Sequence, residues 1–386
     1  MAITYTQPND IAFARSPILF GVYDSTFEDT GFYYTCDVYV WQGLEADKPA
    51  TATYSLEKYP SPNGTATFNI QSLAKDYFIQ PQYTHTSYAD TQQMYSWISV
   101  DLNWVDDAGT GTPIVLDPIV CYNGYNEYLD GVNYVDPFKL GSINSGFFMT
   151  DRPLETNIPS NTSMYMYMTA NSGGSVTGWT ISVNGGADII TGTTTTAGGF
   201  TNELAAVPCG SSEVDALSSE TLETWDVYTN DVGGNPVGKV YTFNLVEPCR
   251  FGFRNLQFMN RYGIWDNIII YGTQIEKLDV ERKEIFNSPL EVSTAAVMTT
   301  NDPYGQFHMS GISGRESLTV NTGWISEDYN EVLKQLMLTE HLFDPDTSQP
   351  FTIDTKSLTV KTALNNGLSF YTFDLKQAHT AINSVY

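Results

Sequence analysis

Residues 255–274, NLQFMNRYGIWDNIIIYGTQ, constrain the fold more than any other stretch of the chain. Two runs of β-forming residues flank the tetrapeptide Asn-Arg-Tyr-Gly at 260–263. Gly263 can adopt a positive φ, and the side chain of Asn260 can hydrogen-bond to nearby backbone, so the tetrapeptide suits a tight corner. The stretch therefore predicts a β-hairpin at the centre of a β-domain.

Trp265 and Asp266 directly follow this corner. A buried indole needs a hydrogen-bond acceptor, and Asp266 or a backbone carbonyl could supply it. We expect Trp265 to anchor the core of the second β-domain, and Arg261 to bond loop carbonyls or a neighbouring subunit; a buried Arg261–Asp266 pair is the alternative. No nucleophile or base accompanies these side chains, so a structural role is predicted and a catalytic one is not. The residues of this structural hairpin and candidate interface are Asn260, Arg261, Tyr262, Gly263, Trp265 and Asp266.

The phrase FMNRYGIWDNIIIYG at 258–272 resembles a segment of virion proteins from tailed phages, especially those of Bacteroidetes hosts. Three further phrases agree with this resemblance: YYTCDVYVW at 33–41, YPSPNGTATFNIQSLAKDYF at 59–78 and VNTGWISEDYNEVLKQLMLTEHLF at 320–343. The resemblance implies a structural component of a phage tail, baseplate or tail-fibre attachment region. It carries over no active-site residues.

The composition favours a β-rich fold and excludes several partners. Aromatic residues make up 13% of the chain and charged residues only 16%, which is typical of strands and polar, uncharged surfaces. A net charge of −26 would repel nucleic-acid phosphate and anionic membranes. We therefore expect neither direct nucleic-acid binding nor membrane association.

The four cysteines are widely spaced and match no zinc pattern. Cys36 lies within an apolar run and is expected to be a buried free thiol; a Cys209–Cys249 disulfide is the less favoured alternative. The first ten residues, MAITYTQPND, lack the features of a signal peptide, and no apolar run approaches the length of a membrane span. Synthesis in a host cytoplasm and assembly into a virion there are expected.

The predicted fold class is mainly β, with two immunoglobulin- or fibronectin-like β-sandwich domains followed by a small α+β domain. Residues 1–112 form the first sandwich because short alternating runs, such as 97–104, recur about every ten residues. The sequence DDAGTGTP at 106–113 breaks this periodicity and marks a boundary. Residues 113–275 form the second β-domain, in which the Tyr/Asn/Gly-rich stretch 121–146 is expected to be a long loop that packs on a neighbouring subunit.

Within the second domain, residues 164–168 alternate Met with Tyr, so a strand there would place three Met on one face and two Tyr on the other. The low-complexity stretch 185–199 predicts a hairpin or a projecting loop. The third domain, 276–386, contains one helix at 327–338 with Ser326 as N-cap. Strands at 351–361 and 368–374 follow it and are joined by an Asn-Asn-Gly turn.

No catalytic motif accompanies the four histidines, His85, His308, His341 and His379, so we expect neither an enzyme nor a cofactor. Two acidic clusters could bind calcium, but a capped turn is the simpler interpretation of each, so no metal site is predicted. The clusters are Asp344, Asp346 and Thr347, and Asp24, Glu28 and Asp29.

The predicted function is therefore a non-enzymatic structural component of a tailed-phage virion. Its expected partners are copies of itself, in a ring or a trimer, and neighbouring tail proteins. The alternatives are a receptor-binding spike or fibre that binds or cleaves carbohydrate, with a host-surface glycan as its ligand, and a capsid-decorating protein. Stacking of sugars on Tyr and Trp, together with the abundance of carboxylates, keeps the glycan alternative open.

Overall fold

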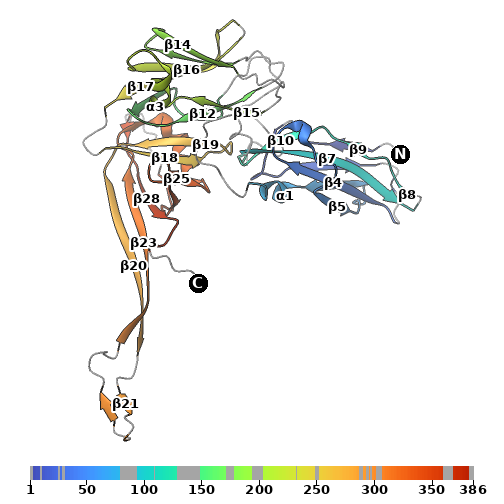
Figure 1. The fold of residues 1–386 in the computed structure, drawn as a ribbon. Coiled ribbons are helices and arrows are strands. Elements are labelled where there is room, and N and C mark those ends of the chain that lie inside the picture. Colours follow the sequence, from blue (N-terminus) through green and yellow to red (C-terminus); the bar gives the residue numbers. More distant parts are fainter. Residues whose placement is uncertain are drawn as a thin grey trace.

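Strands dominate the computed structural model of the chain, and the helices are short, so the prediction of a mainly β protein is confirmed (Figure 1). The structure describes residues 3–8, 11–24, 27, 31–78, 94–107, 109–127, 148–170, 178–193, 203–231, 233–247, 252–286, 290–292, 295, 298–300, 307–359 and 368–381. His85, Cys249, Glu28, Asp29, the stretch 128–147 and the turn 365–367 lie outside them. Among the described residues, no helix has the length and apolar content that crossing a membrane requires.

Two sheets enclose the N-terminal core. One contains β1 (Thr4–Thr6), β3 (Leu19–Tyr23) and β6 (Thr65–Asn69). The other runs β2 (Ile11–Phe13), β10 (Ile119–Tyr122), β7 (Tyr95–Asp106), β4 (Tyr33–Trp41) and β5 (Tyr54–Lys58), with β8 (Gly109–Thr110) and β9 (Ile114–Val115) paired to β7. The short helices η1 (Glu45–Asp47) and α1 (Gln71–Lys75) belong to the same part.

Alternation along the strands fills this core. In β4, residues 34, 36, 38 and 40 are buried while their neighbours are partly exposed. They pack in one cluster with Phe20 of β3 and Phe68 of β6, which come from the other sheet. The prediction of a buried free thiol at Cys36 is confirmed, and burial raises its pKa to about 12.

The middle part also has two sheets. The larger runs β11 (Glu155–Pro159), β17 (Pro236–Val246), β16 (Thr224–Asn230), β13 (Gly178–Val183) and β14 (Asp188–Thr193). The smaller pairs β12 (Tyr165–Ala170) with β15 (Glu203–Pro208), and α3 (Ser211–Leu217) follows. Strand β14 accounts for part of the predicted 185–199 hairpin. Cys209 is a free buried thiol, so no Cys209–Cys249 disulfide forms.

The Met/Tyr alternation of β12 is confirmed. Met164, Met166 and Met168 are buried in the middle core, beside Trp225 of β16. Tyr165 and Tyr167 point to a different cluster, which contains residues of the N-terminal sheet. This strand therefore separates two apolar clusters, one on each of its faces.

A seven-stranded sheet forms the C-terminal part. Its order is β19 (Trp265–Ile270), β18 (Arg254–Met259), β25 (Leu342–Asp344), β26 (Gln349–Ile353), β28 (Thr372–Gln377), β23 (Phe307–Asn321) and β20 (Gln274–Phe286). Two short pairs accompany it: β24 (Ile325–Ser326) with β27 (Leu368–Ser369), and β21 (Leu290–Val292) with β22 (Met298–Thr300).

The predicted helix is present as the 3₁₀ turn η4 (Glu327–Tyr329) followed by α4 (Asn330–Met337). Val332, Leu333 and Leu336 are buried against the apolar face of the seven-stranded sheet, as their helical spacing predicts. Ser326 precedes the first turn, but its side chain makes no capping hydrogen bond.

Strand pairing groups the chain differently from the predicted ranges 1–112, 113–275 and 276–386. Asp106 of β7 pairs with Gly109 of β8 within the first sheet, and β10 completes that sheet up to Tyr122. The hairpin β18–β19 joins the C-terminal sheet, since Gln257 pairs with Phe343. Strands on both sides of the break in periodicity at 106–113 thus belong to one sheet, and pairing between distant strands places the hairpin in another.

Strands β20 and β23 extend beyond the rest of the sheet as a two-stranded ribbon, with β21 and β22 at its far end (Figure 1). They are paired from Gln274↔Val320 to Phe286↔Phe307. Strand β28 accompanies β23 only over residues 317–321. We call residues 277–316 of this ribbon the arm.

Candidate functional site

The corner between β18 and β19 is closed by Asn260. The backbone N–H of Asn260 donates to the carbonyl of Ile264 at 2.9 Å, and the N–H of Gly263 donates to the carbonyl of Asn260 at 3.0 Å. The side-chain oxygen of Asn260 accepts from the N–H groups of Tyr262 at 3.0 Å and Ile264 at 3.2 Å. The prediction that Asn260 bonds its own corner is confirmed.

Gly263 has a φ of +77°, as predicted, and the corner is also packed closely against the chain that leaves β10. A Cβ on Gly263 would lie 2.3 Å from the backbone nitrogen of Gly124, and one on Gly124 would lie 2.4 Å from the carbonyl oxygen of Arg261. The N–H of Tyr125 donates to that same carbonyl at 2.7 Å. Two glycines at facing positions let the two backbones touch.

Replacing Gly263 with alanine is expected to destabilise the fold for two reasons: the strain of positive φ, about 1–3 kcal/mol, and the clash with residues 123 and 124. Gly234 is a matched control, because its φ is +78° and nothing lies within 4 Å of a Cβ there. In urea unfolding, Gly263→Ala should lose more stability than Gly234→Ala. Equal losses of unfolding free energy in the two variants would show that the close approach of the two backbones does not add to the cost of the substitution.

Trp265 is 3% exposed and belongs to an apolar cluster that joins three parts of the chain. We call this set the junction cluster. Its buried members are Ile11, Phe13, Trp41, Met94, Tyr95, Trp97, Val120, Tyr122, Met149, Tyr167, Leu204, Met259, Tyr262, Ile264 and Trp265. The expectation that Trp265 anchors the core of the second domain is therefore corrected: its neighbours include strands β2, β4, β7 and β10 of the N-terminal sheet.

Asp266 forms a buried ion pair with Arg152, not with Arg261. The Nη2 of Arg152 lies 2.7 Å from Oδ1 of Asp266, and the two side chains are 4% and 6% exposed. The same Nη2 donates to the carbonyl of Asn267 at 2.7 Å, and the hydroxyl of Thr150 donates to Oδ2 of Asp266 at 2.5 Å. Burial alone would lower the pKa of Arg152, but the carboxylate of Asp266, together with the nearby Cys209 and Tyr329, raises it.

Asp151 connects the corner to helix α4. Its Oδ1 accepts from the hydroxyl of Tyr262 at 2.9 Å, and its Oδ2 accepts from the amide of Gln335 at 2.6 Å. The Nε of Arg261 lies 3.3 Å from the same Oδ2, and the Arg261 guanidinium stands 4.8 Å from the centre of the Tyr262 ring. The partner of Arg261 is thus a carboxylate of this chain, whereas loop carbonyls or a neighbouring subunit were expected.

Ion pairs also tie the N-terminal part to the end of α4. The Nζ of Lys334 lies 2.6 Å from Glu127, and the Nε of Arg15 lies 3.5 Å from Glu340. A guanidinium N–H of Arg15 donates to the carbonyl of Leu338 at 3.2 Å. The six predicted corner residues therefore lie at a contact between parts of this chain.

His341 packs beside Trp265, with ring centres 6.4 Å apart. Burial lowers its pKa below the ordinary value, and nearby Arg15 and Lys75 act in the same direction while Glu340 opposes them. The unfolded chain therefore takes up a proton at His341 first as pH falls below about 6.5. We expect this residue to contribute stability at neutral pH that is lost on acidification through that window.

The measurement is urea unfolding between pH 7.5 and 5.0 for the parent and for His341→Gln, which cannot be protonated. Subtracting the two curves removes the titration of the many carboxylates. The unfolding free energy of the parent minus that of His341→Gln should fall as pH decreases below about 6.5. A difference that does not change with pH would contradict the expectation.

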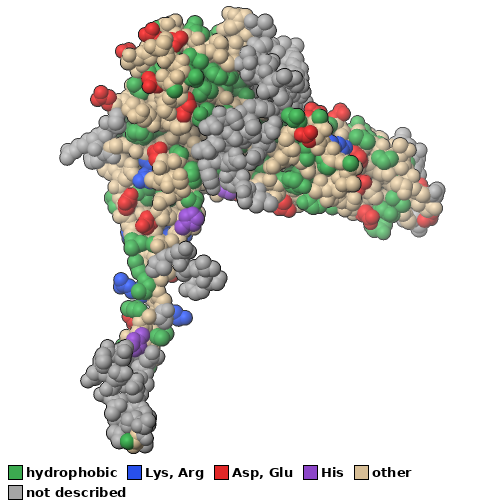
Figure 2. All heavy atoms as spheres, in the orientation of Figure 1, with side chains coloured by type: hydrophobic (Ala, Val, Ile, Leu, Met, Phe, Trp, Pro, Cys, Tyr) green, Lys and Arg blue, Asp and Glu red, His purple; other side chains and the backbone are tan. Residues whose placement is uncertain are grey.

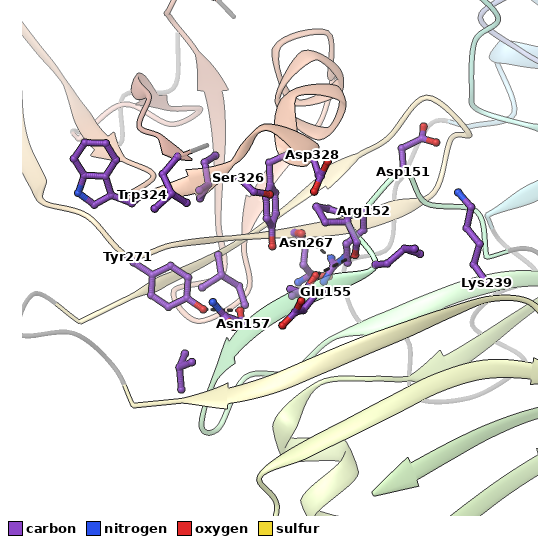
Figure 3. Close-up of a pocket in the computed structure, with 18 of the residues that line it drawn as sticks. Asp151, Arg152, Glu155, Asn157, Lys239, Asn267, Tyr271, Trp324, Ser326 and Asp328 are labelled. Atoms are coloured by element: carbon purple, nitrogen blue, oxygen red, sulfur yellow. Dashed lines mark hydrogen bonds between the residues drawn. The ribbon is translucent and has the colours of Figure 1, made fainter. Parts of the chain in front are cut away.

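A groove lies between the start of β11 and the segment that leads into α4 (Figure 3). Its volume is about 820 Å³. We call it the β11 groove; it is lined by residues 151–157, Lys239, Val246, Glu247, Asn267, Ile269, Tyr271, residues 324–326, Asp328, Tyr329 and Leu368. Asp151, Arg152 and Asn267 line both this groove and the polar network behind the corner.

The acidic cluster at residues 344–347, which was weighed as a calcium site, has a simple structural explanation. Asp344 is a capped turn: its Oδ1 accepts from the N–H groups of Asp346 and Thr347, and its Oδ2 lies 2.7 Å from Nη1 of Arg254. Within the described ranges, no three His, Cys, Asp or Glu side chains are grouped as a metal site would require. His308 lies in the arm and His379 near the end of the described chain.

Sequence reasoning missed the partners of the corner, which are Thr150, Asp151, Arg152 and Gln335. They lie about 75 to 115 positions from it, in segments without a motif. The adjacent charges of Asp151 and Arg152 beside the apolar residues 147–149 are the one local signal. They indicate a polar group near a core without identifying its partner.

No known protein family matches the chain, and no curated protein matches it. Among solved structures it is similar to the polymeric Ig receptor ectodomain of a teleost fish, with 9% identity, 64% of this chain and 100% of that chain covered, and a TM-score of 0.21. It is also similar to the extracellular region of plexin A4, with 8% identity, 99% and 37% covered and a TM-score of 0.19. A Salmonella alpha-2-macroglobulin gives 7% identity, 83% and 25% covered and a TM-score of 0.21. Such scores carry no argument about fold or function.

Proposed function

We propose that the protein is a structural component of a tailed-phage virion, in the tail, baseplate or tail-fibre attachment region, and that it acts through protein–protein assembly. The arm is the observation that carries this proposal. A two-stranded ribbon is marginally stable by itself in water, and exposed strand edges readily pair with other chains. An arm that extends from a sheet into solvent is thus suited to binding a neighbour.

The side chains of the arm support the same role. Large apolar residues are exposed along both strands (Figure 2), and the aromatic pair Phe286 and Phe307 is 64% and 67% exposed. Monomeric soluble proteins rarely expose apolar residues in such continuity without an interaction to make. The expected neighbours are copies of the chain, in a ring or a trimer, and adjacent tail proteins, with the virion as the location.

The proposed domain layout is two immunoglobulin- or fibronectin-like sandwiches and a small α+β domain. One apolar cluster fills the space between the two N-terminal sheets, and another fills that between the two middle sheets. Helix α4 on the seven-stranded sheet supports the third unit. In this layout the arm projects from the third unit of the virion protein.

Mass spectrometry of purified, fractionated phage particles tests the proposal. A matched variant is the arm-shortened chain, in which residues 282–312 are replaced by Asn-Gly, a pair that suits a two-residue hairpin loop between Glu281 and Ser313. The parent chain should be found in particles, whereas the arm-shortened chain should melt like the parent and fail to incorporate. Absence of the parent from particles would end the structural proposal, and release of reducing sugar from host glycan would favour the spike alternative.

A further inference from the structure

Strand β20 is the last strand of the seven-stranded sheet, and it continues into the arm (Figure 1). Strand β23 pairs with its inner edge, and within the described part of the chain no strand pairs with its outer edge. Proteins usually protect such an edge with a proline, a bulge or a short strand. Residues 274–286 contain no proline or glycine, and the extra residue at the register shift belongs to β23. Strand β20 is therefore a long and regular edge.

The backbone of Val280 directs its hydrogen-bonding groups to this outer edge. In antiparallel strands, facing residues alternate between pairs that exchange two hydrogen bonds and pairs that exchange none. Val280 faces Gly314, whose carbonyl accepts instead from the N–H of Ala381 at 2.7 Å, on the other side of β23. The even-numbered residues at 276–282 therefore present their N–H and C=O groups to the outer edge, where another strand could bind them.

The side chains around Asp279 are complementary to a second copy of themselves. When two β20 strands run antiparallel with their Asp279 residues facing each other, every other position from 276 to 282 faces an opposite charge or an apolar side chain. The facing pairs are Glu276 with Arg282, Lys277 with Glu281 and Leu278 with Val280. Each pair occurs twice because the arrangement has two-fold symmetry. Facing pairs of both kinds stabilise a sheet.

Moving the centre to a neighbouring residue removes this match. With Val280 at the centre, Glu276 would face Glu284, and Lys277 would face Lys283. Like charges directly opposite each other destabilise a sheet. With residue 278 or 281 at the centre, Val280 would face a charged side chain. The charge pattern of the strand thus selects the arrangement centred on Asp279.

Within residues 276–282, Asp279 is the position at which like charges meet in this arrangement. Its Oδ1 forms an ion pair with the Nζ of Lys277 in the same chain, and the hydroxyl of Ser317 donates to its Oδ2 at 3.2 Å. Each copy of Asp279 therefore brings its own cation to the centre of the pair, and this cation offsets the repulsion between the two carboxylates.

We propose that the outer edge of β20 pairs antiparallel with the same edge of a second copy of this chain, centred on Asp279. The two seven-stranded sheets then continue into each other across a two-fold axis, and the even-numbered residues exchange backbone hydrogen bonds between the copies. This inference names the partner of the arm and rests on the proposed assembly function. A two-fold contact joins copies in pairs, so a ring needs a second contact elsewhere on the chain.

Cysteine cross-linking tests which positions face each other. The two copies of residue 279 form a pair without backbone hydrogen bonds, in which the Cα atoms lie about 4.5 Å apart, within the range of a disulfide. All chains carry Cys249→Ser, because the other three cysteines are buried. Asp279→Cys should form a disulfide-linked dimer in a glutathione buffer. Lys277→Cys and Glu281→Cys are matched controls: neither should cross-link alone, and their mixture should cross-link.

Charge reversal tests the same arrangement without a disulfide. In a pair of identical copies, Glu276→Arg and Arg282→Glu each place like charges opposite each other. Each variant should therefore self-associate about tenfold more weakly than the parent in sedimentation equilibrium, and each should melt like the parent because both positions are exposed. An equimolar mixture should recover the affinity of the parent, since every Arg then faces a Glu. Glu57→Arg, an exposed reversal on β5, should associate like the parent.

Two results in solution would overturn the inference: an Asp279→Cys chain that does not cross-link, or a mixture of the two charge-reversed chains that associates no better than either alone. Particles in which residue 279 of the Asp279→Cys chain is linked to a different tail protein would also overturn it and would leave the proposed function. Absence of the parent from particles would remove the proposed function, whereas cross-linking in solution would still support the pairing of β20.

Discussion

Replacing Asp266 with alanine is expected to lower the free energy of unfolding by about 3–5 kcal/mol, because it leaves the guanidinium of Arg152 buried without its carboxylate. The guanidinium has little access to water, since its side chain is 4% exposed. Thr150 and the backbone of Asn267 also lose a partner, since both bond the Asp266 carboxylate. Urea unfolding followed by tryptophan fluorescence measures the loss.

Two further variants test whether the loss of stability comes from the unpaired buried charge. Asp354→Ala removes an exposed ion pair with Lys376 and should melt close to the parent, since surface pairs contribute little. The double variant Arg152→Met/Asp266→Leu removes both charges and should be more stable than Asp266→Ala. A single variant that unfolds like the parent would show that water reaches Arg152 and that the pair does not hold the junction.

Replacing Trp265 with alanine is expected to cost about 3–5 kcal/mol of unfolding free energy, as large-to-small changes in a packed interior do. The indole lies among residues from the N-terminal sheet, the middle part and the hairpin itself. The substitution should therefore weaken the contact between these parts. Its cost is a large share of the roughly 5–15 kcal/mol that stabilises a typical domain.

Trp324→Ala is the matched control, because it removes the same side chain from a position that is 70% exposed. Its unfolding free energy should stay within about 0.5 kcal/mol of the parent. The two tryptophans thus compare a buried indole with an exposed one: Trp265→Ala should lower the free energy of unfolding, and Trp324→Ala should leave it nearly unchanged. A Trp265→Ala chain that melts like the parent but fails to enter particles would make the hairpin an interface between subunits.

The local features of the corner were predictable because they depend on adjacent residues. Asn260 and Gly263 have the chemistry of a tight turn wherever they stand, and the alternating residues 164–168 and the stripe of 327–338 follow simple periods. These elements are present in the structure. Burial of Trp265 could also be inferred, since a tryptophan between two apolar strands rarely faces water.

The partners of these elements depend on pairing between distant segments, which one sequence does not specify. Nothing near Gly263 indicates that Gly124 would lie against it, and Arg152 is the partner of Asp266 because the segment that precedes β11 lies against the start of β19. The pairing of the hairpin with the C-terminal sheet could not be predicted for the same reason. The sequence pattern of a hairpin is the same whether the hairpin closes one sheet or begins the next.

Strand β12 has an apolar cluster on each face, and this affects how its register is chosen during folding. In most strands, a slip by one residue would expose apolar side chains and bury polar ones, and this cost keeps the register correct. In β12, a slip against β15 would exchange Met166 for Tyr167, and both faces are apolar. Side-chain volume must therefore discriminate, because tyrosine rings do not fit a core shaped for flexible methionines. The alternation of flexible methionine with wide, rigid tyrosine therefore fixes the register of this strand through side-chain shape instead of polarity.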